Sequence, residues 1–175
     1  MQILSIEKKH LKKFSPVVMR ELKKRGLTLE FNPKDLTVEF ESEDPFIELK
    51  GKDVLTALGT GGVPYREALR LFSDELVLKV IDISEVVGDK ERDVHRVLAR
   101  IIGTDGKTKK IIEQITEVCM TVQEGRIYLI GTIEGVSLAS DAIDALVRGA
   151  PHKKVYRLLE AGRRKVREEK MKLWK

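Results

Sequence analysis

The sequence contains an internal repeat, and this repeat limits the possible folds more than any other feature of the chain. Three short matches align the two halves, namely Ala57-Leu58, Pro64 and Arg70-Leu71 in the first and Ala145-Leu146, Pro151 and Arg157-Leu158 in the second. The offset is 88 residues at the first match and 87 at the other two, so a single deletion aligns the halves. We therefore expect two tandem domains of about 75 residues, each a copy of one structural unit.

Hydrophobic periodicity predicts the same order of elements in both halves. In the first half it predicts strand 2–5, helices 7–14 and 17–25, strands 27–31 and 36–40, and helix 44–58. In the second half it predicts strand 76–81, helices through 94–101 and 111–115, strands 118–122 and 126–130, and helix 134–148. Each half therefore has the order β-α-α-β-β-α, which places the chain in the α+β class.

Domain boundaries follow from the repeat and from a glycine-rich segment, Gly59-Thr-Gly-Gly62, which is the predicted hinge after the first unit. The expected division is a first domain over 1–62, a connecting helix over 63–75, a second domain over 76–150 and a basic C-terminal helix over 151–175. The apolar stripe predicted for that last helix consists of Val155, Leu158, Leu159, Gly162 and Val166. Trp174 falls in an end that we expect to be frayed.

Positive charge is concentrated at the two ends of the chain. The whole chain has 33 basic and 28 acidic residues, a net charge of +5. Counted along the sequence, the net charge is +6 over 1–26, −6 over 27–75, −2 over 76–150 and +7 over 151–175. Clustered positive charge suits a polyanionic partner such as nucleic acid, although a solvated helical face is the alternative.

Several classes of protein are excluded by what the sequence lacks. No apolar run approaches the roughly 20 residues of a membrane-spanning helix, so no membrane association is expected. Cys119 is the single cysteine, and the three histidines form no zinc-binding pair, so we expect no disulfide, no structural metal and no cofactor. The first residues show no secretory signal, which predicts a reducing, cytoplasmic location.

The segment Ile101-Ile-Gly-Thr-Asp-Gly-Lys-Thr108 contains a G-x-x-G loop between two predicted helices. In KH domains such a loop clamps the backbone of about four nucleotides. Glycine lets a phosphate approach the backbone closely, and the N-terminus of the following helix attracts it. Asp105 stands where many such loops carry a basic residue, so Lys107 and Arg100 are expected to supply more of the attraction. A glycine turn with a purely structural role is the alternative.

The sequence does not favour an enzyme. Gly106-Lys107-Thr108 resembles the end of a phosphate-binding P-loop, but the full motif requires glycine at position 101, where this chain has isoleucine. No Ser/His/Asp set or pair of acids stands out, and His95 lies on a basic helix, where solvation is the expected state. We predict that the protein is not an enzyme.

The first half lacks the glycine loop. Phe14-Ser15-Pro16 occupies its position, and proline has no N–H to offer a phosphate. The sequence therefore predicts a degenerate first KH domain without a standard clamp. Its basic residues either contact phosphates or form a solvated face.

Two stretches of the second half resemble a known family. Ile101 to Ile112 and Arg148-Gly-Ala-Pro-His-Lys-Lys-Val-Tyr-Arg-Leu-Leu-Glu160 are similar to the archaeal branch of the two-KH-domain small-subunit ribosome biogenesis factors, relatives of the eukaryotic partner-of-Nob and KRR proteins. The resemblance covers essentially the whole chain. It implies two type I KH domains and binding to small-subunit rRNA near its 3′ end. It also implies as partners the endonuclease that matures this end and the alpha subunit of translation initiation factor two.

The resemblance and the loop together give a set of expected RNA-binding residues. Ile112 and the strand from Met120 to Val122 are expected to form the floor of the groove, and the basic C-terminal helix is expected to extend the contact along phosphates. The complete set is Arg100, Ile102, Gly103, Thr104, Asp105, Gly106, Lys107, Thr108, Lys109, Lys110, Ile112, Met120, Thr121, Val122, Lys153, Lys154, Arg157, Arg163 and Arg164.

The predicted function is a single-stranded RNA-binding assembly factor that acts on small-subunit rRNA. One alternative is a protein-interaction scaffold that recruits a nuclease or an initiation factor. A second alternative is a regulator that selects messenger RNA.

Overall fold

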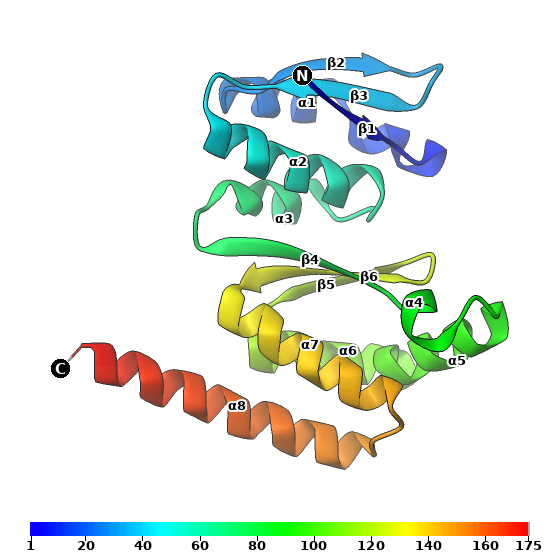
Figure 1. Ribbon diagram of the computed structural model, residues 1–175, viewed down its shortest axis with the longest axis vertical. Coiled ribbons are helices and arrows are strands. Elements are labelled where there is room, and N and C mark those ends of the chain that lie inside the picture. The colour runs from blue at the N-terminus through cyan, green and yellow to red at the C-terminus, as the bar shows by residue number, and fades with distance from the viewer. Residues whose placement is uncertain (175) are drawn as a thin grey trace. The chain divides into compact units, whose positions relative to one another are not determined.

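The computed structural model describes residues 1–174 and shows two compact units, Met1–Leu78 and Lys79–Lys175 (Figure 1). Lys175, the last residue of the predicted C-terminal helix, lies outside the described residues. Both units alternate strands and helices in the predicted order, so the α+β class is confirmed.

The first unit contains one antiparallel sheet with the strand order β1-β3-β2. Its elements are β1 (Gln2–Ser5), the 3₁₀ helix η1 (Lys8–Lys13), α1 (Pro16–Lys24), β2 (Thr28–Asn32), β3 (Thr37–Glu41), α2 (Pro45–Gly59), α3 (Tyr65–Leu69) and the 3₁₀ helix η2 (Arg70–Phe72). The sheet's central strand brings Val38 opposite Leu4, and Phe40 opposite Leu29. Val38 and Phe40 are fully buried with Leu22 of α1, which anchors the helix on the sheet.

The predicted hinge at 59–62 is held by contacts with earlier residues of the first unit. Lys13 Nζ donates hydrogen bonds to the carbonyl oxygens of Gly62 and Val63, and His10 Nδ1 lies 3.1 Å from the carbonyl oxygen of Gly59. Burial lowers the pKa of Lys13. The compact unit continues through α3 and η2, which pack on α2, and ends at Leu78 rather than at residue 62.

The second unit repeats the topology, with the strand order β4-β6-β5. Its elements are β4 (Leu76–Asp82), α4 (Ser84–Val87), α5 (Glu91–Ile102), the 3₁₀ turn η3 (Thr104–Gly106), α6 (Lys107–Thr116), β5 (Cys119–Gln123), β6 (Arg126–Thr132), α7 (Ile133–Val147) and α8 (His152–Leu173). The four-residue helix α4 was not predicted. Strands β5 and β6 meet in a two-residue turn in which Glu124 and Gly125 both have positive φ, the geometry typical of tight hairpins.

Helices α5, α6 and α7 enclose an apolar core with the central strand β6. Ile101, Ile112, Leu129 and Ile143 are all at most 1% exposed. This core fixes the two helices that flank the glycine loop, so the loop is held between rigid elements.

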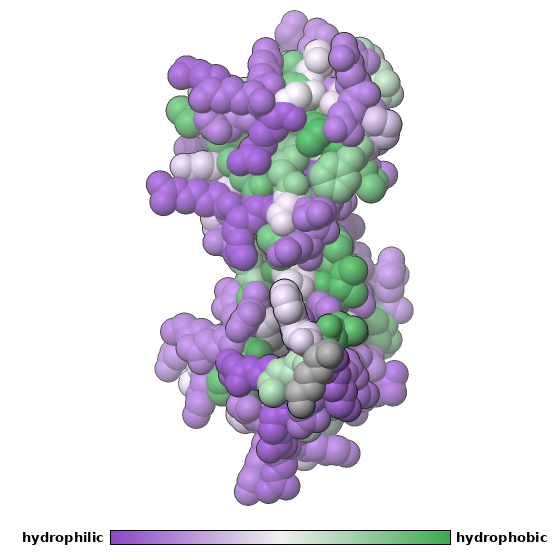
Figure 2. All heavy atoms as spheres, turned by 90° about the vertical axis from the view of Figure 1, so that its left-hand side faces the viewer, coloured by the Kyte–Doolittle hydropathy of each residue, from purple (hydrophilic) through white to green (hydrophobic). Residues whose placement is uncertain are grey.

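Helix α8 packs on α6 and α7 through the first part of its length. Val155 and Leu159 are fully buried, as predicted, but Leu158 is 37% exposed, because it falls on the outer side of the helix. Gly162 allows close contact with α7, since a Cβ there would lie 2.3 Å from Leu138 Cδ1. Beyond Val166 the described residues are exposed, and they include the apolar side chains of Met171, Leu173 and Trp174. Figure 2 shows hydrophilic and hydrophobic side chains side by side around this end of the helix.

Candidate nucleic-acid interface

The glycine loop reverses the chain between α5 and α6 within four residues. Gly103, Asp105 and Gly106 all have positive φ, at 75°, 52° and 72°. Aspartate tolerates the left-handed region better than most residues, because its short polar side chain can hydrogen-bond locally. The backbone geometry therefore gives a physical reason for an acidic residue at Asp105, where the sequence alone suggested a loss of attraction for RNA.

The two glycines of the loop are required for different reasons. A Cβ at Gly103 would lie 2.4 Å from Thr108 Oγ1 and 2.8 Å from its backbone nitrogen, so any side chain there would push the loop away from α6. A Cβ at Gly106 would meet nothing within 4 Å, so the space beside this backbone is open. Gly106 is thus the point at which a phosphate can approach the loop.

The N-terminus of α6 is prepared for an anion. Its N-cap residue is Gly106, and no side chain caps the helix. The first turn contains Lys107, Lys109 and Lys110 and no acidic residue. Unsatisfied N–H groups and the helix dipole favour a phosphate at this position. Lys107 and Lys110 are exposed, whereas Lys109 lies 3.8 Å from the Glu113 carboxylate.

Helix α8 forms the other side of the loop. Thr108 Oγ1 lies 3.2 Å from Tyr156 Oη, and His152 Nε2 lies 3.0 Å from the carbonyl oxygen of Arg100. A depression of about 440 Å³ separates the loop from α8, and we name it the α8 depression. It is lined by Arg96, Ala99, Arg100, Gly103, Thr104, Lys107, Thr108, His152 and Tyr156.

Arg100 has a structural contact that the sequence did not predict. Its Nη2 donates a hydrogen bond of 2.7 Å to the carbonyl oxygen of Ala150, in the turn between α7 and α8. Its Nε is buried and has no hydrogen-bond partner among the described residues. Arg100 therefore ties α5 to this turn while it lines the α8 depression.

Three of the predicted RNA-binding side chains are buried. Ile112 and Met120 are 0% and 1% exposed, because both point into the core between the helices and the sheet. Thr108 is 3% exposed, and its hydroxyl faces Tyr156. These side chains support the interface from below and offer RNA almost no surface. Thr121 and Val122 of β5 remain half-buried at the sheet edge.

A backbone donor on the outer edge of β5 is already paired with a side chain of α6. Met120 N donates a hydrogen bond of 2.9 Å to Glu113 Oε1 of α6, and β5 pairs with β6 on its other side. The strand edge nearest to α6 therefore already has one donor satisfied by a carboxylate.

The predicted basic residues of α8 do not form one cluster. Lys153 and Arg157 are exposed in the first turns of the helix, whereas Lys154 borders a second hollow beside Asp141 and Asp144. Arg163 lies about 16 Å further along the helix than His152, at 1.5 Å per residue. It lines another depression, with Ile115 and Leu138. The helix therefore presents cations along its length rather than at the loop alone.

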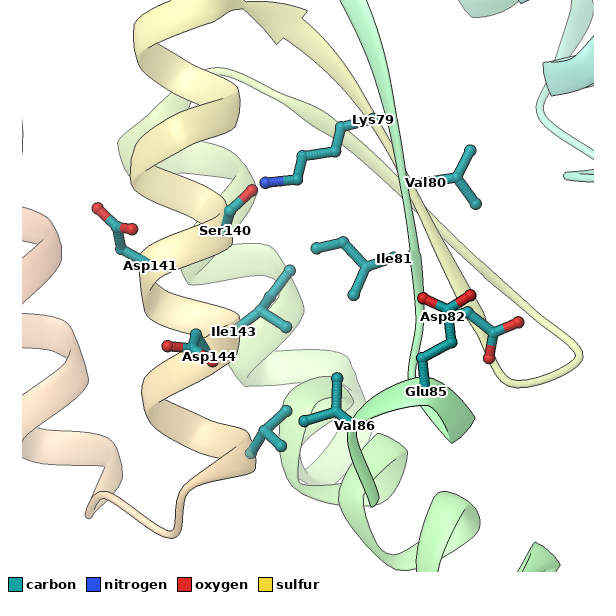
Figure 3. Close-up of a pocket in the computed structure, with 11 residues that line it drawn as sticks. Lys79, Val80, Ile81, Asp82, Glu85, Val86, Ser140, Asp141, Ile143 and Asp144 are labelled. Atoms are coloured by element: carbon teal, nitrogen blue, oxygen red, sulfur yellow. The ribbon is translucent and has the colours of Figure 1, made fainter. Parts of the chain in front are cut away.

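An acidic groove runs along the opposite edge of the same sheet (Figure 3). It lies between β4 and α7, has a volume of about 360 Å³, and is lined by Asp82, Glu85, Asp141 and Asp144 around Ile81 and Ile143. Hydrogen bonds from the Ser84 hydroxyl and from Arg126 hold the pKa of Asp82 below its ordinary value. Four carboxylates against Lys79 repel a phosphate chain, so this groove is unfavourable for the backbone of a nucleic acid.

The first unit has no equivalent of the glycine loop. Ser15 caps α1, accepting a hydrogen bond of 3.4 Å from Val18 N, and Pro16 occupies the first helical position. Phe14 is buried and stacks on Phe31 at 5.9 Å between ring centroids. The start of this helix is therefore capped by Ser15 and covered by Phe14.

Residues 1–174 hold no group of three or more His, Cys, Asp or Glu side chains placed to bind a metal ion. Among the same residues, no helix has the length and apolarity needed to cross a bilayer.

Sequence reasoning missed Arg96, His152 and Tyr156, which face the glycine loop. His152 and Tyr156 are four positions apart on α8, so they share one face of the helix, with ring centroids 6.3 Å apart. Their spacing was visible in the sequence, but their position opposite the loop depends on how α8 packs.

The fold and the glycine loop define a type I KH-domain protein. Residues 77–164 match a family model for the second KH domain of PNO1, described as a eukaryotic type KH domain (KH-domain type I). The chain belongs to the PNO1 family of KH-domain proteins.

Two curated relatives illustrate the match. The KH domain-containing protein MJ0443 of Methanocaldococcus jannaschii is 37% identical over 124 residues, which are 71% of this chain and 54% of the relative. RNA-binding protein pno1 of Dictyostelium discoideum is 35% identical over 83 residues, which are 47% of this chain and 35% of the relative. The chain thus spans about half or less of the length of these relatives.

Solved structures extend the similarity to both units. A protein of unknown function, APE0754 from Aeropyrum pernix, superimposes with a TM-score of 0.92 at 30% identity, covering 99% of this chain and 96% of the other. The complex of a/eIF2alpha, aDim2p and rRNA from Pyrococcus horikoshii OT3 contains a chain that matches with a TM-score of 0.81 at 27% identity, with 94% of each chain covered.

Proposed function

We propose that this protein binds single-stranded RNA through the glycine loop of its second unit and acts in the assembly of the small ribosomal subunit. The observation that carries the proposal is the start of α6. There a helix of ten residues begins without a side-chain cap, with three lysines in its first turn and with open space beside Gly106. A phosphate backbone is the ligand that such a position favours.

The relatives support the choice of RNA. One relative is named an RNA-binding protein, and the aDim2p structure contains rRNA. We therefore infer that the bound RNA is small-subunit rRNA or its precursor, near the 3′ end. The cytoplasmic location and the absence of enzymatic activity expected from the sequence are parts of the same proposal.

Protein partners form a second part of the proposal. The aDim2p structure also contains a/eIF2alpha, which supports an initiation factor as a partner. The endonuclease that matures the rRNA 3′ end is the other partner that we infer. The acidic groove between β4 and α7 offers a surface for a protein on the sheet edge that the RNA does not use.

A single substitution in the loop tests RNA binding. Thr104 is exposed, so Thr104→Asp adds a negative charge beside Asp105 without disturbing the core. We expect the affinity for a single-stranded 12-nucleotide RNA, measured by fluorescence anisotropy, to fall about tenfold or more, because the new charge opposes the phosphates.

Thr104→Asn is the matched control, because asparagine has nearly the same shape as aspartate but carries no charge. We expect its affinity to stay within about twofold of the unmodified protein. Circular dichroism should show both variants folded. Equal affinities for the Asp and Asn variants would reject the loop as the RNA-binding site.

A further inference from the structure

Strand β4 is an edge of the second unit's sheet, and this edge borders the acidic groove. The strand pairs with β6 on one side, and within residues 1–174 no strand pairs with its other side. Four consecutive residues of β4, Lys79 to Asp82, line the groove. At the strand rise of about 3.3 Å per residue, they present about 13 Å of backbone. The groove therefore gives access to the backbone of an edge strand.

The floor of the acidic groove is apolar. Ile81 of β4 and Ile143 of α7 point toward each other across it, whereas Val80 points to the opposite side of the strand (Figure 3). Val86 of α4 and Val147 of α7 complete the apolar lining, and Val86 is exposed. An apolar side chain of a bound segment can therefore be buried between β4 and α7.

Carboxylates stand on both sides of this floor, and two of them have no cation as a partner. The four are Asp82, Glu85, Asp141 and Asp144. Asp82 pairs with Arg126 at 3.0 Å. Asp144 pairs with Arg148 at 2.9 Å. Among residues 1–174 no ion pair involves Glu85, on the α4 side, or Asp141, on the α7 side (Figure 3). The groove thus offers one unpaired carboxylate on each side.

We propose that the acidic groove binds an extended, basic segment of a protein partner, which adds to β4 as a further strand. An apolar side chain of the segment lies over Ile81 and Ile143. Its lysine or arginine side chains reach Glu85 and Asp141. Successive side chains of a strand point to opposite faces, so a segment of alternating basic and apolar residues fits the groove. The proposal rests on the proposed function, because it specifies how a protein partner binds.

The charge of the groove selects this occupant. The lining contains four carboxylates and one ammonium group, that of Lys79. In a symmetric dimer, a second copy of the chain would bring the same acidic groove to this edge, so like charges would meet. A nucleic acid would bring its phosphates. A basic protein segment has the complementary charge and also supplies the backbone groups that an edge strand can pair with.

Two peptides test the addition of a strand. The probe is the fluorescein-labelled peptide Arg-Val-Arg-Val-Arg-Val-Arg with blocked ends, and its binding is measured by anisotropy. The control peptide has N-methyl groups on two neighbouring central residues, whose N–H groups point to opposite edges of a strand. It keeps the charge and loses a donor on each edge. We expect it to bind about tenfold more weakly, and equal binding of both peptides would reject strand addition.

Glu85→Gln combined with Asp141→Asn tests the charge of the groove. We expect this variant to bind the probe peptide about tenfold more weakly, because each carboxylate contributes about threefold. The matched control is Glu168→Gln with Glu169→Gln, which removes two exposed carboxylates from the far part of α8 and should change binding by less than about twofold. Lys79→Gln removes the one cation of the lining and should strengthen binding about twofold. Equal losses in the two double variants would reject the groove as the site.

Hydrogen exchange measured by NMR locates the added strand. Only every second N–H of an edge strand points to its open side. We therefore expect the probe peptide to slow the exchange of alternate backbone amides within Lys79 to Asp82. Unchanged exchange along β4 with the peptide bound would overturn the proposal.

The outcomes also distinguish this proposal from the RNA-binding part of the proposed function. Thr104→Asp should change binding of the probe peptide by less than about twofold. If the peptide fails to bind and Thr104→Asp weakens RNA binding, the groove proposal is rejected and the RNA-binding function stands. If the peptide binds as expected and Thr104→Asp leaves RNA binding unchanged, the RNA-binding function fails and the groove proposal stands.

Other occupants of the groove would give different results. A dimer of the protein in analytical ultracentrifugation that the probe peptide dissociates would assign the groove to a second copy. A loss of RNA affinity in the Glu85→Gln, Asp141→Asn variant would assign it to RNA. Either result would overturn the proposal, which expects a monomer and an unchanged RNA affinity.

Discussion

Thr108 Oγ1 and Tyr156 Oη lie 3.2 Å apart although 48 positions separate the two residues in the chain. The contact joins the first turn of α6, directly after the glycine loop, to the first turns of α8. It makes the position of the loop depend on a helix that lies outside the β-α-α-β-β-α unit.

A double-mutant cycle measures this contact. Thr108→Val and Tyr156→Phe should each lower the free energy of unfolding by about 1 kcal/mol, because each removes one partner of the same hydrogen bond. The double variant should lose little more than either single one, since the bond can be lost only once. Urea denaturation gives the three values, and strictly additive losses would show that the hydroxyls do not interact.

The two loop glycines should respond differently to the same substitution. Gly103→Ala combines a positive φ with a Cβ 2.4 Å from Thr108 Oγ1, so we expect a loss of about 3 kcal/mol in the free energy of unfolding. Gly106 also has a positive φ, but a Cβ there would meet no other atom. For Gly106→Ala we therefore expect a loss of about 1 kcal/mol in the free energy of unfolding. Thermal and urea unfolding of the pair compare them directly. Similar losses would contradict the close approach of Gly103 to α6.

Asp82 makes a pH-dependent contribution to stability. Its pKa is lowered in the folded protein, first by the Ser84 hydroxyl and then by Arg126, so its ionised form is favoured by folding. The contribution is therefore present above the unfolded pKa of about 3.9 and is lost as the pH falls through the lower folded value.

The substitution Asp82→Asn tests this contribution. At pH 7 it should lower the free energy of unfolding by no more than about 1 kcal/mol, because the pair with Arg126 is partly exposed. The difference from the unmodified protein should shrink below about pH 4. The exposed Asp89→Asn is the control, and a difference that stays constant with pH would refute the assignment.

Arg163 and Arg164, which lie far along α8 from the loop, should contribute to the binding of long RNA only. Arg163 lies about 16 Å beyond His152 along the helix, so an RNA octamer held at the loop is not expected to depend on it. Arg163→Gln combined with Arg164→Gln should make the salt dependence of binding for a 20-nucleotide RNA shallower by about 1.4, since each lost phosphate contact contributes about 0.7. Anisotropy titrations at several salt concentrations measure the slope. An unchanged slope would remove these two residues from the proposed interface.

Local sequence signals predicted much of the second unit. The glycine loop, the two strands predicted at 118–122 and 126–130 and the long helices depend on residues that are near each other in the chain, and the structure places them close to the expected positions. Helix α4 was missed because four residues are too few to show helical periodicity.

Features that depend on distant contacts were not predictable. Glycines at 59–62 suggested a hinge after the first unit, and the sequence did not show that Lys13 and His10 from an earlier segment contact this stretch. Ile112 and Met120 were expected in the floor of the RNA groove, and the extent of their burial, which the packing of α6 on β5 causes, could not be predicted from the sequence. The placement of Tyr156 beside the loop likewise depends on tertiary packing.

The hydrogen bond from Met120 N to Glu113 Oε1 has a consequence for association between molecules. An edge strand with free backbone donors is a template on which a strand of another chain can add. In β5 the carboxylate of Glu113 accepts a hydrogen bond from one of these donors, and it places negative charge at the edge. An incoming strand would have to displace Glu113 and bury part of that charge, so this edge opposes the growth of the sheet into aggregates.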